Sequence, residues 1–253
     1  MSEEFGPQGL SVLALTSEGE SPTQKWIEDK GAKYPYAYDS GGKLSRALGI
    51  SGIPAAVLID ASGKIIWQGH PSSVNKELIE KAIKGAISTP IYEWSGSAKS
   101  IKSAFLKGNL AKAISEADKL AAKEDLGTEI AAMLRGMVAK RVSGIQADLE
   151  LGDVLGAQVA AKALVKGLKG LPEEVVLKTL MKSISADKSL KKILSTQGRL
   201  ADLLLTERKK MKDAEKIIKK LEQLQKSNDD EYTKDLITKA IKDLKEERRK
   251  MKR

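Results

Sequence analysis

Strand-forming patterns stop at Pro90, and this change constrains the fold more than any other feature of the sequence. Before it, short apolar runs alternate with helical stretches, and after it only helical patterns separated by turn signals occur. The net charge divides in the same place, since the first 88 residues carry about −1 and the remainder about +11. The sequence therefore predicts two domains, residues 1–89 and residues 90–253, with different partners.

The first segment has the element order of an α/β layer structure. Short apolar runs predict two buried strands, a largely buried one at Leu10–Leu15 and another at Ala55–Ile59, and a further strand at Lys64–Trp67. The tight turn Asp60–Gly63 joins the last two as a hairpin, and Tyr34–Tyr38 is extended. Helices are predicted from Ser21, as the N-cap before Pro22, to Gly31, over 43–48 and over 73–87. This order predicts helices packed on a mixed sheet.

The second segment is predicted to be all-α. Helices are expected at roughly 97–107, 110–123, 128–150, 154–169, 173–185, 188–205, 208–226 and 231–251. Two of the breaks, Gly108-Asn109 and Gly152-Asp153, lie 44 residues apart, and an alanine stands four positions after each Asn or Asp. Because a small residue lets paired helices approach closely, we expect a helical repeat-like array, with a period longer than the ~34 residues of a tetratricopeptide repeat.

The inventory of reactive side chains is small. The chain has no cysteine, and its one histidine is His70. Disulfides, thiolate metal sites and thiol catalysis are excluded for these residues, and no catalytic, metal or cofactor site is predicted. We expect His70 to be a structural hydrogen-bonding residue, and Asp39 and Asp60 to be turn and cap residues. No apolar run approaches the ~20 residues of a membrane span, and the acidic start differs from a signal peptide.

Basic clusters such as Lys216–Lys220 and Arg248–Arg253 give the second segment its charge. Interleaved Asp and Glu and the scarcity of aromatic residues are typical of solvated helix faces. Nucleic acid is therefore not an expected partner. Attraction to anionic lipid or to a cell-wall polymer is an alternative that the sequence supports about as well as nucleic-acid binding.

Several motifs of the first segment occur together in one known family. They are Tyr34–Asp39, Leu48–Pro54, Val57–Asp60, Gly63–Trp67 and Gly69–Pro71. Through them residues 10–87 resemble the thioredoxin-like family, in particular the bacterial envelope branch of TlpA-type and redoxin proteins. The resemblance implies a cis peptide bond between Ile53 and Pro54. It also implies that Gly52, Ile53 and Pro54 form a loop that faces the substrate polypeptide.

The sequence departs from that family in one respect. The family's central strand and Cys-x-x-Cys would precede Leu10–Leu15, where Glu3–Gly9 resembles only the tail of the following helix. The resemblance thus implies an incomplete thioredoxin-like domain, inactive in thiol exchange as written. We expect the chain to be the C-terminal part of a periplasmic thiol-disulfide oxidoreductase of the bacterial envelope. If Met1 is the true start, the lack of a signal peptide predicts a cytoplasmic protein instead.

The loss of a central strand leaves two inner strand edges unpaired, which is unfavourable when they are buried. Either these edges pair with each other, or another segment fills the gap. A homo-oligomer could complete the sheet in this way. We expect either the helical segment or a second copy of the chain to cover the apolar surface near Val12, Leu13, Val57 and Leu58. The alternative function is a non-enzymatic adaptor that binds a protein or peptide through its helices and its proline loop.

Overall fold

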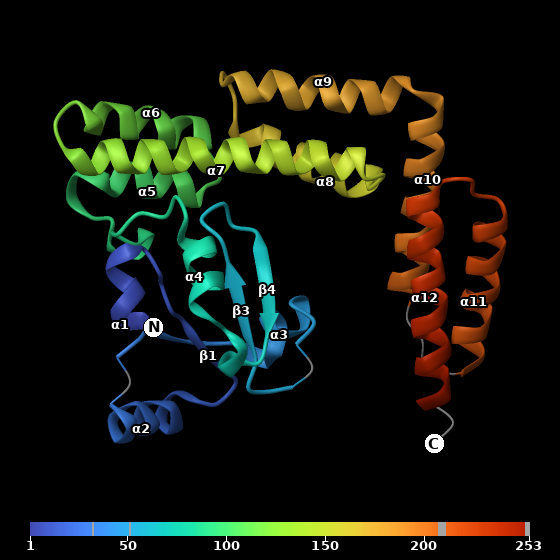
Figure 1. The fold of residues 1–253 in the computed structure, drawn as a ribbon, viewed down its shortest axis with the longest axis horizontal. Helices are drawn as coiled ribbons and strands as arrows, with labels where there is room; N and C mark the ends of the chain where they lie inside the picture. Colours follow the sequence, from blue (N-terminus) through green and yellow to red (C-terminus); the bar gives the residue numbers. More distant parts are fainter. Residues whose placement is uncertain (32, 51, 207–210, 251–253) are drawn as a thin grey trace. The chain divides into compact units, whose positions relative to one another are not determined.

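The computed structural model describes residues 1–31, 33–50, 52–206 and 211–250 of the chain (Figure 1). They form two compact units, one of residues 1–107 and 112–137, the other of residues 108–111 and 138–253. The helix α7 (Asp125–Glu150) contributes residues to both units. All strands of the described residues precede residue 70, so the expected α/β region followed by helices only is confirmed. The domain boundary after residue 89, which follows the loss of strand patterns, stays a prediction.

The strands of the first unit form two separate two-stranded sheets. β1 (Ala14–Thr16) pairs with β2 (Tyr36–Tyr38) in parallel, and β3 (Ala56–Ile59) forms an antiparallel hairpin with β4 (Ile65–Gly69). The hairpin is therefore as predicted, but the mixed sheet is divided. Since β1 and β3 each have one paired neighbour, the two inner edges do not pair with each other in the described part of the chain.

The prediction of buried strands is wrong for this unit. None of the residues in β1–β4 is fully buried, and Leu13 and Leu15 are 56% and 43% exposed. β1 is also shorter than the apolar run Leu10–Leu15. Strands of a parallel sheet become buried only when both faces are covered and both edges are paired. β1 has the apolar sequence of such a strand without that environment.

The helices of the first unit begin and end at local capping signals. α2 (Glu20–Lys30) starts two residues earlier than expected, because Gly19 and not Ser21 is its N-cap. Thr23 stabilises this start by donating its hydroxyl to the Gly19 carbonyl oxygen at 2.9 Å. Pro22 is accommodated because first-turn N–H groups have no partner within the helix. Gly31 ends the helix in a left-handed conformation, with φ of 61°.

The last helix of the α/β region, α4 (Lys76–Ile83), is shorter than the predicted 73–87. Its N-cap is Asn75, whose Oδ1 accepts the Leu78 N–H at 2.9 Å. Pro71–Ser73 forms a separate 3-10 helix. α4 buries Ile79 and Ala82, as its apolar face predicts.

Three further helical segments complete the first unit: α5 (Lys99–Leu106), most of α6 (Leu110–Ala121) and the first half of α7. Their core is aliphatic and contains the fully buried Ile101, Ile130 and Leu134. Trp94 is 3% exposed, contacts Phe105 edge-on at 6.3 Å and donates its indole N–H to the Thr89 carbonyl. This part of the unit therefore has the closed packing that the strands lack.

The second unit contains helices only within its described residues. After the second half of α7 come α8 (Val154–Leu164), α9 (Pro172–Ala186), α10 (Lys188–Leu205), α11 (Met211–Lys226) and α12 (Glu231–Lys250). Each lies where a helix is predicted, although positions 208–210 and 251 of the predictions fall outside the described residues. A core cluster joins α10, α11 and α12, and Leu221 and Ile237 within it have no exposed surface. The helical repeat stays a prediction.

Candidate functional site

The loop Gly52-Ile53-Pro54 lies between α3 (Lys43–Ala47) and β3. The Ile53–Pro54 peptide bond is cis, and all three residues are exposed. Ile53 is 94% exposed, the largest exposed fraction among the large apolar side chains of the described residues. An isoleucine gains about 1.5–3 kcal/mol when it is fully buried. The loop therefore presents an apolar side chain that a bound molecule could cover.

Asp39 fixes the helix that precedes this loop. It is 8% exposed, and its carboxylate accepts hydrogen bonds from Leu44 N, Ser45 N and Ser45 Oγ at 2.9, 2.9 and 2.7 Å. The backbone N–H groups of Leu44 and Ser45, followed by the Ser45 hydroxyl, lower the pKa of Asp39. Asp39 is thus the cap residue that the sequence predicts.

The hairpin on the other side of the loop is held in a similar way. Gln68 of β4 donates its side-chain amide to the Leu48 carbonyl at 3.2 Å, which links the hairpin to the end of α3. Asp60 Oδ1 accepts the N–H groups of Ser62 and Lys64 in the hairpin turn. The loop is therefore anchored on both sides by side-chain hydrogen bonds.

His70 has a structural role, as the sequence predicts. Its Nδ1 accepts the Ser72 N–H at 3.3 Å and lies 2.7 Å from the Ser72 hydroxyl oxygen. The imidazole thus caps the 3-10 helix at Pro71–Ser73. Across the described ranges no group of three or more His, Cys, Asp or Glu side chains is placed to hold a metal ion.

An aromatic cluster is the other prominent feature of this unit. The Tyr36 ring stacks on Tyr34 at 5.3 Å and meets Trp26 edge-on at 5.9 Å. Burial, together with the neighbouring Tyr34 phenol, raises the pKa of Tyr36 to about 12. Tyr36 therefore stays protonated at neutral pH and is unsuited to act as a general base. The cluster supports β2 and carries no nucleophile.

The second unit contains two cavities that the sequence analysis missed. The first, of about 430 Å³, is lined by α8, α10 and α12, chiefly with leucines: Leu155, Leu200, Leu204, Leu236 and Leu244. The second, of about 470 Å³, is lined by α7 and α9 and includes Val175, which is 65% exposed. Polar and charged side chains, among them Gln146, Glu150 and Thr179, also line the second cavity. Cavities of this size are typical of binding sites.

Gln197 lies at the first of these cavities and is 3% exposed. Its amide nitrogen donates to the Gly152 carbonyl at 2.7 Å and to Thr233 Oγ1 at 3.0 Å, while its oxygen accepts the Leu155 N–H at 2.8 Å. These bonds join α8, α10 and α12. A glutamine on the otherwise apolar face of a predicted helix is the signal that could have identified it.

The sequence of the N-terminal part is similar to thioredoxin-like proteins of the thiol-disulfide oxidoreductase class. Residues 1–68 match the AhpC/TSA family. The chain is 28% identical over 82 residues to the thiol-disulfide oxidoreductase ResA of Bacillus thuringiensis subsp. konkukian, covering 32% of this chain and 47% of that protein. It is 29% identical over 92 residues to the thiol:disulfide interchange protein DsbE of Vibrio cholerae, covering 36% and 47%.

These matches concern one part of the chain. The chain spans about half the length of each of these two relatives. No solved structure matches it significantly. Among the helices that the structure describes, none combines the length and apolar character needed to cross a membrane.

Proposed function

We propose that this chain is the substrate-binding part of a thiol-disulfide oxidoreductase of the bacterial envelope. In this role the loop Gly52-Ile53-Pro54 binds an extended polypeptide substrate. The observation that carries the proposal is the 94% exposure of Ile53 in an anchored loop next to Pro54. The relationship of residues 1–68 to the AhpC/TSA family supports the class of reaction. Residues 1–89 form the thioredoxin-like domain in this proposal, and residues 90–253 form a separate helical domain.

The chemistry of thiol exchange requires a thiolate that attacks a disulfide sulfur. The 253 residues contain no cysteine, so this chain contributes binding and not the nucleophile. In the proposed enzyme, the Cys-x-x-Cys belongs to residues outside this sequence. The intact mass and N-terminal peptide of the endogenous protein test this point. A mass above 27.4 kDa with a Cys-x-x-Cys peptide supports the oxidoreductase, whereas a mass of 27.4 kDa contradicts it.

The open strand edges support binding of an extended chain. Among the residues that the structure describes, β1 and β3 each pair with one strand, so a further strand could add to the other edge of each. The exposed side chains of Leu13 and Leu15 give that edge an apolar character. A second copy of this protein is an alternative source of such a strand, and it would produce the homo-oligomer that the sequence suggests.

Peptide binding tests the role of the loop directly. We expect Ile53→Ser to raise the Kd for a labelled, unfolded, cysteine-containing peptide about tenfold, because burial of the isoleucine is lost. Leu106→Ser is the matched control, since Leu106 is also apolar and 68% exposed but lies at the end of α5. Fluorescence anisotropy measures both affinities. Equal affinities of Ile53→Ser and the unmodified chain would refute binding through this loop.

A second candidate function is a non-enzymatic adaptor that binds a folded protein through its helices. The two cavities of the second unit, with the exposed Val175 and the leucine-lined walls, favour this candidate. A partner that binds Ile53→Ser and the unmodified chain equally, but is lost on Val175→Asp, would support the adaptor over the oxidoreductase.

A further inference from the structure

Lysines predominate on the exposed face of α11. Five lysines form what we call the α11 lysine row: Lys212, Lys216, Lys219, Lys220 and Lys226. Lys212, Lys216 and Lys219 or Lys220 are three or four residues apart and Lys226 follows Lys219 by seven, which places all five on one side of the helix, and all five are exposed. Opposite them, Ile217, Leu221 and Leu224 are buried in the core cluster. Among the described residues, none of the five has an ion-pair partner.

Two of the three acidic side chains of α11 pair with residues of α12. Glu215 pairs with Arg248 of α12 at 3.3 Å, and Glu222 pairs with Lys245 of α12 at 3.6 Å. Both carboxylates are therefore engaged at the contact between the two helices. The five lysines of the row outnumber the acidic side chains of α11, which are Asp213, Glu215 and Glu222.

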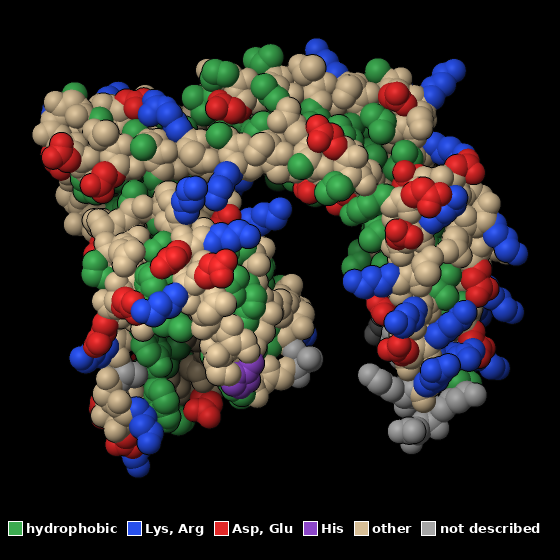
Figure 2. Space-filling model, viewed as in Figure 1, with side chains coloured by type: hydrophobic (Ala, Val, Ile, Leu, Met, Phe, Trp, Pro, Cys, Tyr) green, Lys and Arg blue, Asp and Glu red, His purple; other side chains and the backbone are tan. Residues whose placement is uncertain are grey.

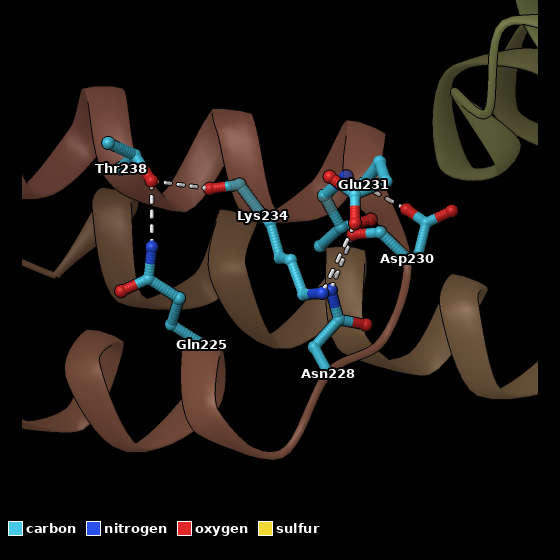
Figure 3. A network of polar contacts seen from close by, with 7 residues as sticks. Gln225, Asn228, Asp230, Glu231, Lys234 and Thr238 are labelled. Carbon is cyan, nitrogen blue, oxygen red and sulfur yellow. Dashed lines mark hydrogen bonds and ion pairs between the residues drawn. The ribbon is translucent and has the colours of Figure 1, made fainter.

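Polar contacts surround the turn between α11 and α12 (Figure 3). Gln225 of α11 donates to Thr238 of α12 at 2.7 Å. Asp230 Oδ2 accepts the Thr233 N–H at 2.8 Å, and Glu231 pairs with Lys234 at 3.3 Å. The acidic residues of the turn are thus occupied as well, and α11 is held against α12 at this end.

The exposed face of α12 has a different charge pattern. Acidic and basic side chains alternate along it: Asp235, Lys239, Lys242, Asp243 and Glu246. In the space-filling view, acidic and basic side chains are intermixed over the α10–α12 region (Figure 2). A row of five lysines on one side of a helix is therefore found on α11 and not on α12.

We propose that the α11 lysine row is a docking surface for an anionic lipid bilayer. The row extends over fifteen residues, from Lys212 to Lys226, which is about 21 Å of helix. Because the apolar side chains of α11 are used in the core cluster, the contact is electrostatic and the helix does not insert. The row contains no arginine for bidentate phosphate binding and no aromatic residue for base stacking, which favours lipid over nucleic acid. The proposal is independent of peptide binding at Ile53.

Vesicle sedimentation of the full chain tests this proposal, with phosphatidylcholine alone and with an equimolar mixture of phosphatidylcholine and phosphatidylglycerol. We expect binding only to the anionic vesicles, decreasing as salt is added. A lysine near such a surface contributes about fivefold in affinity, so Lys212→Gln/Lys216→Gln/Lys219→Gln should bind on the order of a hundredfold more weakly. Because these lysines are exposed, the variant is expected to fold, which circular dichroism checks.

A control variant that loses three positive charges at other positions distinguishes an effect of the lysine row from an effect of net charge. Lys182→Gln/Lys191→Gln/Lys242→Gln changes three exposed lysines on α9, α10 and α12 and should lose less than about fivefold. Equal losses in the two triple variants would overturn the proposal. Binding to duplex DNA with no binding to anionic vesicles would also overturn it.

Discussion

Replacing Gly167 with alanine is expected to destabilise the helical unit by about 3 kcal/mol, at the upper end of the range for overpacking. Gly167 is buried at the end of the 3-10 helix Val165–Gly167 that follows α8. A Cβ at this position would lie 2.1 Å from the Gly108 carbonyl oxygen. Because carbon and oxygen atoms normally approach to about 3.3 Å, the two backbone segments would have to separate by about 1 Å. Neither atom belongs to a flexible side chain that could move away.

Thermal unfolding followed by circular dichroism measures the effect. A loss of about 3 kcal/mol corresponds to a decrease in Tm of about 6–12 °C for a protein of this size. Gly198 of α10 provides the matched control, since a Cβ there would meet no atom within 4 Å. Gly198→Ala should therefore stabilise the helix by about 0.5–1 kcal/mol. If the two variants shift Tm in the same direction, or Gly167→Ala leaves it unchanged, the close backbone contact is refuted.

Two further substitutions test hydrogen bonds described above. Gln197→Leu should lower the free energy of unfolding by about 2–4 kcal/mol, because it leaves the Leu155 N–H and its other partners unpaired, whereas Gln225→Leu, at a half-buried residue, should change it by less than about 1 kcal/mol. Equal values from urea unfolding would contradict this. The pKa of Asp39 is lowered in the folded state, so its carboxylate stabilises the fold above the ordinary pKa of about 3.9, and this contribution is lost as pH falls through the lowered value. Asp39→Asn should therefore lower the free energy of unfolding at neutral pH, and the difference from the unmodified chain should shrink as the pH falls. A difference in the free energy of unfolding that does not change with pH would refute this explanation.

The helical half could be predicted well because its signals are local. Asp153 and Asp187 each follow a break in the pattern, and each accepts backbone N–H groups of the first turn of the next helix. A cap and an apolar period suffice to locate such a helix. The start of α2 was missed because Gly19 and Ser21 are both acceptable N-caps, and only the bond between Thr23 and Gly19 decides between them.

Features that depend on distant residues could not be predicted in this way. The apolar run Leu10–Leu15 has the composition of a buried strand, but burial requires neighbours on both edges that a local pattern does not specify. The loop Gly52-Ile53-Pro54 was identified through a family resemblance and not through its own composition. The cavity at Gln197 combines side chains from α8, α10 and α12, and nothing in any one helix indicates that the three meet.

The open edges of β1 and β3 also affect how the protein behaves at high concentration. An unpaired apolar strand edge can template the growth of intermolecular sheets. β1 and β3 contain no charged residue that would oppose such growth, although Pro54 and Asp60 bound β3 closely and keep its edge short. A strand that occupies these edges therefore competes with aggregation, and the natural binding partner of the N-terminal unit would act as its solubility factor.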